Sequence, residues 1–229
     1  MIFLKLTYIK KDNKYKTIRQ VLKKEFNISN RLLIKLKKEN KIFLNGKNLY
    51  LDYILNYNDI IEVFIDFKEN SSNIKPVKMN LNIMYEDEYF IVLDKPSNMP
   101  IHPSILHYED TLSNGLKYYF NENKIDKKIR PVNRLDRNTS GLVIFAKNEY
   151  IQELFIKQMS THLIHKEYIA LLEGIVKNDE GIINEPILRK KDSIIERCVS
   201  PDGDTAITTY KVIQRYNNYS LVKFKLITR

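Results

Sequence analysis

The sequence predicts an α+β protein in which a small N-terminal α/β module precedes a larger domain with a mixed, mainly antiparallel sheet. Basic residues gather at the front: residues 1–79 hold 17 Lys and Arg against 8 Asp and Glu, whereas residues 80–229 hold 21 against 20. Apolar residues recur at helical spacing over residues 17–39, and the later strand-like segments do not alternate with helices as βαβ units do. The resulting division is a module at residues 1–68, a linker at 69–80 and the larger domain at 81–229.

The composition narrows the class of protein. Of the 229 residues 43% are hydrophobic and 11% aromatic, which is enough material for a packed core. Cys198 is the only cysteine and can form no internal disulfide, and the four His show no metal-ligand spacing with it. No apolar run approaches the length of a membrane span. We therefore expect a monomeric cytoplasmic protein without metal or membrane.

The module is expected to begin with a strand over residues 2–9 and to continue with a helix. Thr17 and Gln20 have the spacing of a capping box, so Thr17 should open that helix. The spacing of its apolar residues gives the helix one buried face. That face consists of Ile18, Val21, Leu22 and Phe26.

A second helix is expected from the N-cap Ser29 to about residue 39, burying Leu32, Leu33 and Leu36. Three basic residues on it lie three and four positions apart and form a single stripe. Such a stripe suits a polyanion, although a solvated Lys-rich surface would show the same pattern. The stripe consists of Arg31, Lys35 and Lys38.

Asn45-Gly46 is a strong hairpin signal, and a further strand is expected over residues 59–65, before an aperiodic stretch up to residue 80. Two short helices, a basic second helix and a hairpin resemble the small RNA-binding module first described in a ribosomal small-subunit protein and found also in tyrosyl-tRNA synthetase. The resemblance covers residues 16–64 and implies that the basic stripe contacts RNA. The alternative is an ordinary α/β subdomain whose lysines keep it soluble.

The larger domain is expected to open with a hairpin of residues 81–85 and 89–94. Three prolines then stiffen the loop of residues 95–103, and such rigid loops often line sites. A later helix should bury one face made of Ile151, Leu154, Phe155 and Met159. Further strands are expected over residues 142–146, 168–172, 206–212 and 220–227.

Residues 130–147 (RPVNRLDRNTSGLVIFAK) carry the clearest chemical signal. Asp136 lies between Arg134 and Arg137, and adjacent positive charge favours the ionised, nucleophilic form of a carboxylate. The same arginines could hold a phosphodiester backbone. Gly141 permits a tight turn at the entrance of the next strand. The alternative is a charged turn in which Asp136 only pairs with an arginine.

This segment resembles the signature of the RluA-type pseudouridine synthases, H-R-L-D-x-x-T-S-G-L followed by an apolar strand and A-K. It departs at Asn133, where that family most often has His. That His is not the nucleophile, so the change bears on the fine positioning of the site and not on its chemistry. Residues 85–103 resemble the family's opening hairpin and Lys-Pro loop, and residues 166–174 its K-x-Y-x-A-L-x-x-G strand. The matches within the signature are Arg134, Leu135, Asp136, Thr139, Ser140, Gly141, Leu142, Ala146 and Lys147.

The resemblance implies a catalytic domain of pseudouridine synthase type that isomerises specific uridines in structured RNA, rRNA or tRNA. Asp136 would be the nucleophile and Tyr168 a catalytic base, although a strand tyrosine is commonly a packed core residue. No cofactor is implied. The residues expected to bind substrate RNA are Arg134, Arg137, Thr139 and Lys166, together with Arg31, Lys35 and Lys38.

At residues 226–229 the family pattern breaks off before its R-x-H-Q-I-R segment, so a C-terminally incomplete chain is expected. Two other functions stay open. The chain could be a non-catalytic RNA-binding protein with a degenerate or truncated synthase domain. A glycoside hydrolase using Asp136 would need a second carboxylate, for which the sequence shows no convincing candidate.

Overall fold

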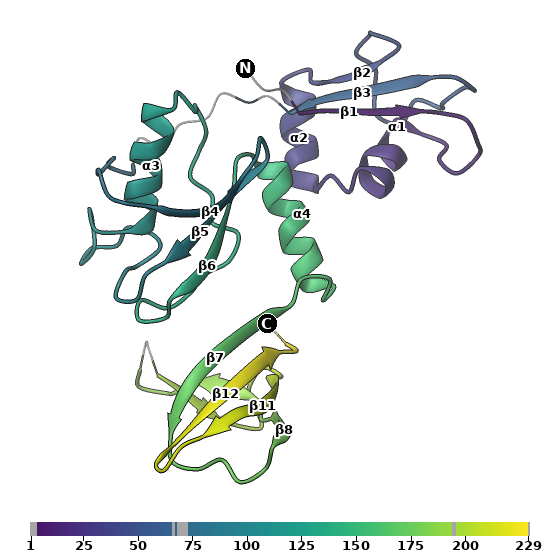
Figure 1. Cartoon of the computed structure of the whole chain (residues 1–229). Coiled ribbons are helices and arrows are strands. Elements are labelled where there is room, and N and C mark those ends of the chain that lie inside the picture. The colour runs from purple at the N-terminus through teal and green to yellow at the C-terminus, as the bar shows by residue number, and fades with distance from the viewer. Residues whose placement is uncertain (1–3, 66, 68–72, 194–195, 229) are drawn as a thin grey trace. The chain divides into compact units, whose positions relative to one another are not determined.

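The computed structural model describes residues 4–65, 67, 73–193 and 196–228 (Figure 1). The chain forms two compact units, Met1–Ile156 and Lys157–Arg229. The linker expected at residues 69–80 falls inside the first unit, and its residues 69–72 lie outside the described residues. In the described part of the chain, no helix is long and apolar enough to cross a membrane.

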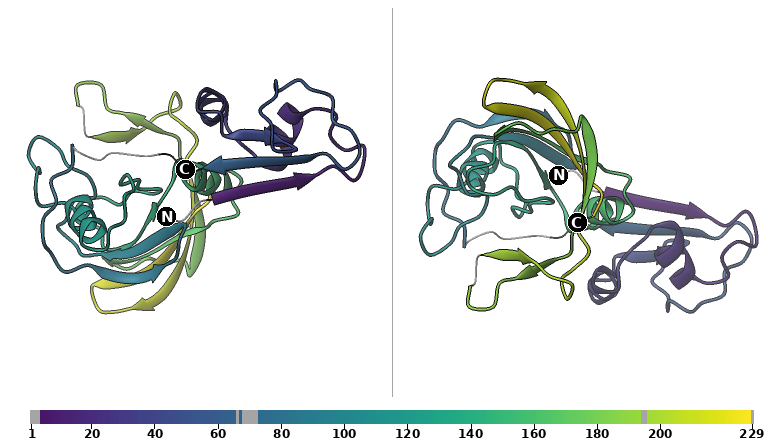
Figure 2. Two further views of the ribbon diagram at one scale, coloured as in Figure 1. Left: turned by 90° about the horizontal axis from the view of Figure 1, so that it is seen from above. Right: turned by 90° about the horizontal axis from the view of Figure 1, so that it is seen from below.

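The N-terminal part of the first unit is a three-stranded antiparallel sheet with its helices on one face (Figures 1 and 2). Leu22, Leu32, Leu36 and Ile61 are fully buried between the helices and the sheet. The strand order is β1 (Leu4–Ile9), β3 (Ile60–Ile65), β2 (Ile42–Leu44), and the helices are α1 (Ile18–Gln20), the π-helix η1 (Val21–Glu25) and α2 (Asn30–Lys38).

The two predicted helix starts are confirmed. The Thr17 hydroxyl accepts a hydrogen bond from the Gln20 N–H, and the Ser29 hydroxyl accepts one from the Leu32 N–H. The Gln20 side chain accepts from the Lys16 N–H, one residue before the expected partner. The first helix widens after one turn, because the Phe26 N–H donates to the Val21 carbonyl. Apolar spacing did not predict this π-helical turn.

The Asn45-Gly46 turn is also confirmed. Both residues have positive φ, +48° and +77°, which a type I′ turn requires. The second arm of the hairpin is a single bridge from Lys47 to Leu44, and β2 pairs mainly with β3.

A second antiparallel sheet lies in the same unit, with a helix across one of its faces (Figures 1 and 2). Its core contains Leu93, Leu116, Phe120 and Val143. The strand order is β4 (Asn82–Glu86), β5 (Phe90–Lys95), β6 (Gly141–Ala146), and the helix is α3 (Leu112–Glu122).

The described end of the predicted linker, residues 73–80, packs against α3. Ile74 is 3% exposed, and the Asn114 side chain donates to the Lys75 carbonyl over 2.8 Å. A Cβ at Gly115 would lie 2.6 Å from Met79 Sδ. Glycine at this position therefore allows the segment to approach the helix closely.

Helix α4 (Glu149–Ser160) differs from its predicted burial. Its predicted apolar face is only half-buried, and Tyr150 is the buried residue of the helix. The reason is that two neighbours share the apolar side chains. Ile151 and Leu154 pack against the N-terminal core, whereas Phe155 meets Phe90 edge-on with ring centroids 5.0 Å apart.

The second unit is built around a four-stranded antiparallel sheet (Figure 1). Val222 is fully buried in it, whereas Ile169, Leu171 and Ile182 are exposed. The strand order is β7 (Lys166–Glu173), β12 (Tyr219–Leu226), β11 (Ile207–Arg215), β8 (Glu180–Asn184), and β9 (Ile187–Arg189) pairs with β10 (Arg197–Val199). Together the sheets confirm the predicted mainly antiparallel α+β class.

Candidate active site

The segment that leads to Asp136 is held against strand β6. The Val132 N–H donates to the Ile144 carbonyl over 2.8 Å. The Asn133 side chain then continues the pairing in place of main chain. Its amide donates to the Leu142 carbonyl over 3.0 Å, and its oxygen accepts from the Ile144 N–H over 2.8 Å. Asn133 thus fixes the loop three residues before Asp136.

The turn that carries Asp136 is also tied to the proline-rich loop. The Thr139 N–H donates to the Asp136 carbonyl over 3.1 Å, and Gly141 takes a φ of +126° where β6 begins. The Met99 N–H donates to the Arg137 carbonyl over 3.1 Å, and the Ser97 hydroxyl donates to the Asn138 carbonyl over 2.7 Å.

Lys95 lies at the centre of this junction and is fully buried. Its ammonium donates to three carbonyls: Pro96 at 2.9 Å, Met99 at 2.8 Å and Arg137 at 3.0 Å. Burial lowers the pKa of Lys95, and the charge of Asp136 opposes that shift by raising it. The buried ammonium therefore interacts electrostatically with the Asp136 carboxylate, and its hydrogen bonds hold the turn in place.

The two loops enclose a cavity of about 610 Å³, within the range of small-molecule sites. Asp136 is exposed in it, and within the described residues no hydrogen bond or ion pair joins its carboxylate to Arg134 or Arg137. The structure therefore does not show the simple charged-turn pairing. The cavity is lined by Pro100, Ile101, His102, Pro103, Ser104, Pro131, Arg134, Leu135, Asp136, Arg137 and Gln152.

The structure brings together some of the predicted site residues. Arg134 and Arg137 line the cavity with Asp136, and Thr139 belongs to the same turn. Tyr168 and Lys166 lie on β7 of the second unit, opposite Phe224 and Leu226 of β12. Their approach to Asp136 remains a proposal.

The basic stripe on α2 divides into two kinds of residue. Arg31 and Lys38 are exposed. Lys35 is half-buried, forms an ion pair with Glu149 of α4 at 2.6 Å, and lies 3.6 Å from the Phe67 ring centroid. Arg31 and Lys38 are therefore open to solvent, whereas Lys35 also contributes to packing within the unit.

Sequence reasoning missed Gln152, which lines the cavity from α4. Its side-chain amide donates to the carbonyl of Pro131, another lining residue, over 2.9 Å, so it holds part of the cavity wall in place. Gln152 is one of several polar residues on α4, so the sequence held no signal that singled it out. The buried role of Lys95 was missed as well, since lysine is rarely found inside a fold.

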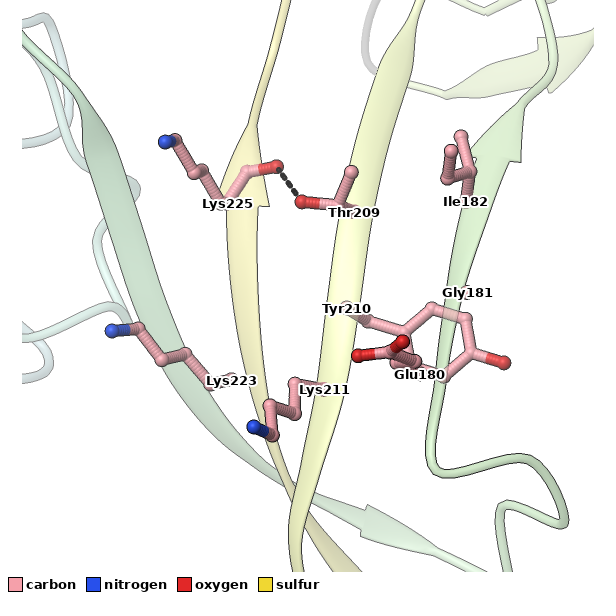
Figure 3. A pocket seen from close by; sticks show the side chains of 8 residues that line it. All are labelled: Glu180, Gly181, Ile182, Thr209, Tyr210, Lys211, Lys223 and Lys225. Carbon is pink, nitrogen blue, oxygen red and sulfur yellow. Dashed lines mark hydrogen bonds between the residues drawn. The ribbon is translucent and has the colours of Figure 1, made fainter.

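A second cavity of about 420 Å³ lies on the sheet of the second unit (Figure 3). Lys211, Lys223 and Lys225 reach it from neighbouring strands, and Lys223 pairs with Glu167 at 2.9 Å. Its other lining residues include Glu180 and Thr209. Its lysines suit an anion, but none of the residues of the Asp136 segment lines this cavity. Within the described residues, no cluster of His, Cys, Asp or Glu could hold a metal ion.

Comparisons with known proteins relate the chain to one family. A family model described as RNA pseudouridylate synthase matches residues 89–229. The uncharacterized RNA pseudouridine synthase YlyB of Bacillus subtilis is 31% identical over 194 residues, covering 83% of this chain and 64% of that protein. The ribosomal large subunit pseudouridine synthase D of Borreliella burgdorferi is 38% identical over 173 residues, covering 72% and 53%. The chain thus spans between about half and two thirds of these relatives.

The fold has a counterpart among solved structures. Human RNA pseudouridylate synthase domain containing 1 aligns with a TM-score of 0.56 at 23% identity, covering 68% of this chain and 63% of that one. The fold is thus that of a pseudouridylate synthase domain, an α+β fold with mainly antiparallel sheets. The chain belongs to the RNA pseudouridylate synthase family.

Proposed function

We propose that this chain isomerises specific uridines to pseudouridine in structured RNA, with Asp136 as the nucleophile. The observation that carries the proposal is the exposed Asp136 carboxylate in a cavity it shares with Arg134 and Arg137. A carboxylate without a partner among the described side chains is available to a substrate, and two guanidinium groups suit the phosphates on either side of a nucleotide. The name of the Borreliella relative favours large-subunit rRNA over tRNA.

The reaction is an isomerisation, so it needs neither a redox partner nor an added group. The target uridine first leaves its stack, at a cost of roughly a few kcal/mol that is least for an unpaired base. Asp136 then assists cleavage of the glycosidic bond, by attack on the anomeric carbon, by attack on carbon 6 of the base, or along a glycal route. The uracil rotates and rejoins through carbon 5, and any bond to Asp136 breaks. Carbon 5 then loses its proton, and N1, freed from the sugar, gains one.

Tyr168 is proposed to accept that final proton. Its place on β7, two residues from Lys166, puts a phenol and an ammonium on the same side of the strand. The ammonium would contact the substrate RNA, as would the Thr139 hydroxyl beside Asp136.

The N-terminal part is proposed to be the RNA-binding module. Its support is the α2 stripe, of which Arg31 and Lys38 are exposed, and the concentration of basic residues in residues 1–79. The protein is proposed to act as a monomer in the cytoplasm. A chain with a single cysteine suits that reducing compartment, and the proposed RNA substrate is found there.

The test compares Asp136→Asn with the exposed control Asp126→Asn. Pseudouridine is mapped on large-subunit rRNA transcripts by carbodiimide-dependent stops of reverse transcription. We expect Asp136→Asn to abolish the stops while thermal stability and RNA binding persist, and Asp126→Asn to behave as the unchanged chain. Activity retained in Asp136→Asn would remove Asp136 from its role. If the unchanged chain binds the RNA but forms no pseudouridine in it, the non-catalytic RNA-binding alternative is favoured.

A further inference from the structure

Three lysines gather on one face of the sheet in the second unit, where they line the hollow of about 420 Å³ (Figure 3). Lys223 and Lys225 lie on β12, and Lys211 lies on the neighbouring strand β11. Residues two apart on a strand point to the same face of a sheet, and Lys211 is the direct cross-strand partner of Lys223. The three ammonium groups therefore belong to one surface.

This arrangement does not help the sheet itself. Like charges directly opposite each other on adjacent strands are destabilising, and Lys211 and Lys223 are such a pair. Lysines on edge strands protect a sheet from aggregation, but β12 and β11 are the two inner strands of this sheet. Structures depart from such local rules mainly at functional sites, so these lysines are candidates for binding.

Most of the positive charge is left without a counter-charge. Lys223 pairs with Glu167 at 2.9 Å, and its hydrogen bond lowers the pKa of that carboxyl, which the charge of Lys225 lowers further. Glu180 also lines the hollow, opposite Lys211 on β8. In the described part of the chain, however, no hydrogen bond or ion pair joins the Lys211 or Lys225 ammonium to another residue. Two ammonium groups are thus available to an anion from outside.

The spacing of the lysines suits a row of anions. Adjacent strands lie about 4.8 Å apart, and residues two apart on one strand are separated by about 6.7 Å. The ammonium groups therefore form a strip, with a spacing comparable to that of successive phosphates along an RNA strand. Lysine binds phosphate as a point charge and needs no fixed geometry for it.

We propose that Lys211, Lys223 and Lys225 bind the phosphate backbone of the substrate RNA, as a contact surface separate from the Asp136 cavity. The inference rests on the proposed function, because it takes RNA as the ligand. An acidic protein segment would meet the same charges. RNA is favoured because the chain belongs to the RNA pseudouridylate synthase family.

The first experiment maps the contact directly. The full chain, alone and bound to a large-subunit rRNA transcript, is treated briefly with an amine-acetylating reagent, and each lysine is read by mass spectrometry. We expect RNA to slow the acetylation of Lys211, Lys223 and Lys225 several-fold. The matched controls are exposed lysines of the same unit that do not line the hollow, and they should react as in the free chain. These are Lys177, Lys190 and Lys191.

The same footprint distinguishes the possible ligands. Inorganic phosphate, at the phosphate concentration of the RNA, should leave the three lysines reactive. Protection by inorganic phosphate equal to that by RNA would overturn the RNA assignment in favour of a single-anion site. Bound RNA that leaves the three lysines fully reactive would also overturn it, and an acidic protein would become the better partner.

The second experiment measures what the surface contributes. The triple variant Lys211→Gln, Lys223→Gln, Lys225→Gln should reduce the log–log salt slope of RNA binding by about 2, at ~0.7–0.9 per phosphate contact. KM for the transcript should rise while kcat stays unchanged, because the surface binds RNA and takes no part in the chemistry. The corresponding triple Lys→Arg variant should keep the slope, since arginine also binds phosphate.

The control for charge is Lys177→Gln, Lys190→Gln, Lys191→Gln, which removes as many charges from the same unit and should leave slope and KM unchanged. An equal fall in the two glutamine variants, or no fall in either, would overturn the proposed surface. Pseudouridine formed by the unchanged chain without protection of the three lysines would remove this surface only. Protected lysines without any pseudouridine would instead contradict the proposed function and leave the RNA contact in place.

Discussion

The Lys95 ammonium donates to the Arg137 carbonyl over 3.0 Å, joining residues 42 positions apart in the chain. Arg137 follows Asp136 directly, so this bond fixes the main chain at the proposed nucleophile. The same ammonium holds the Pro96 and Met99 carbonyls of the proline-rich loop. A single buried cation thus sets the distance between the two walls of the cavity.

Replacing that cation should damage both stability and activity. In Lys95→Met the Pro96 and Met99 carbonyls lose their donor, whereas the Arg137 carbonyl keeps the Met99 N–H, and an unsatisfied buried polar group costs about 1–3 kcal/mol. We expect a loss of about 3 kcal/mol or more in the free energy of unfolding, measured by urea titration, and a large fall in kcat. Lys75→Met is the control, because Lys75 pairs with Glu109 on the surface and such pairs contribute about 0–1 kcal/mol. Equal effects in the two variants would contradict this account of Lys95.

The charge of Asp136 should be visible in the titration of Lys95. Burial lowers the pKa of Lys95 and Asp136 raises it, so Asp136→Asn should lower that pKa further. A lowered pKa in the folded chain means that the unfolded chain takes up this proton first as pH falls below the ordinary value of 10.5. Protonation of Lys95 therefore lowers the free energy of unfolding as pH falls from 10.5 through the folded pKa, and this window should widen in Asp136→Asn. Nitrogen NMR of the lysine side chain measures the shift directly, with Asp126→Asn expected to leave it unchanged.

Asn133 is predicted to be a positioning residue. Its two hydrogen bonds to β6 hold the loop before Asp136, so Asn133→Ala should lower kcat while KM changes little. A displacement of 1 Å at a reacting group can cost on the order of 100-fold in rate. Asn121→Ala on the exposed face of α3 should have no such effect. A rise in KM with unchanged kcat would point instead to direct substrate binding by Asn133.

The α2 stripe should contribute to RNA binding unevenly. Arg31→Gln with Lys38→Gln removes two exposed charges and should reduce the log–log salt slope of RNA binding by about 1.5, at ~0.7–0.9 per phosphate contact. Lys35→Gln breaks the ion pair with Glu149 and should instead lower the free energy of unfolding by about 1–2 kcal/mol. A slope unchanged by the double substitution would make the stripe a solvated surface.

Two glycines of the second unit should differ in their tolerance of alanine. A Cβ at Gly203 would lie 2.6 Å from the Ile187 main-chain carbon, whereas a Cβ at Gly181 would meet the Tyr210 ring at a similar distance. A ring can rotate away but main chain cannot move alone. We therefore expect Gly203→Ala to lower the thermal midpoint more than Gly181→Ala. The reverse order would show that the Tyr210 ring is the more rigid neighbour.

Local signals in the sequence predicted much of the fold. The caps at Thr17 and Ser29 and the Asn45-Gly46 turn depend on neighbouring residues alone, and all three are confirmed. Helix α3 was missed because its capping box pairs Thr111 with Asn114 instead of Glu or Gln, and because Gly115 interrupts it. That glycine is needed only because a distant segment packs there, which local pattern does not reveal.

The sequence motif of the candidate site could be predicted, but the distant residues that hold the motif in place could not. Asp136 and its arginines are neighbours in sequence, so their grouping required no tertiary information. The bonds from Lys95 and Gln152 join residues far apart, and a buried lysine runs against its usual preference for water. Whether Tyr168 meets Asp136 depends on two separate units, and no local pattern determines that.

The placement of Tyr150 has a consequence for how the protein folds. Its ring is buried with residues of the N-terminal core, and its hydroxyl donates to the Phe26 carbonyl over 2.8 Å, across 124 positions of chain. A contact of this span forms only when the two ends of the unit meet. Because closing so long a loop costs conformational entropy, we expect the contact to form late in folding. The proposed RNA-binding module and the proposed catalytic loops should consequently melt in one cooperative transition. An RNA that stabilises the proposed RNA-binding module would then raise the melting temperature of the proposed catalytic loops as well.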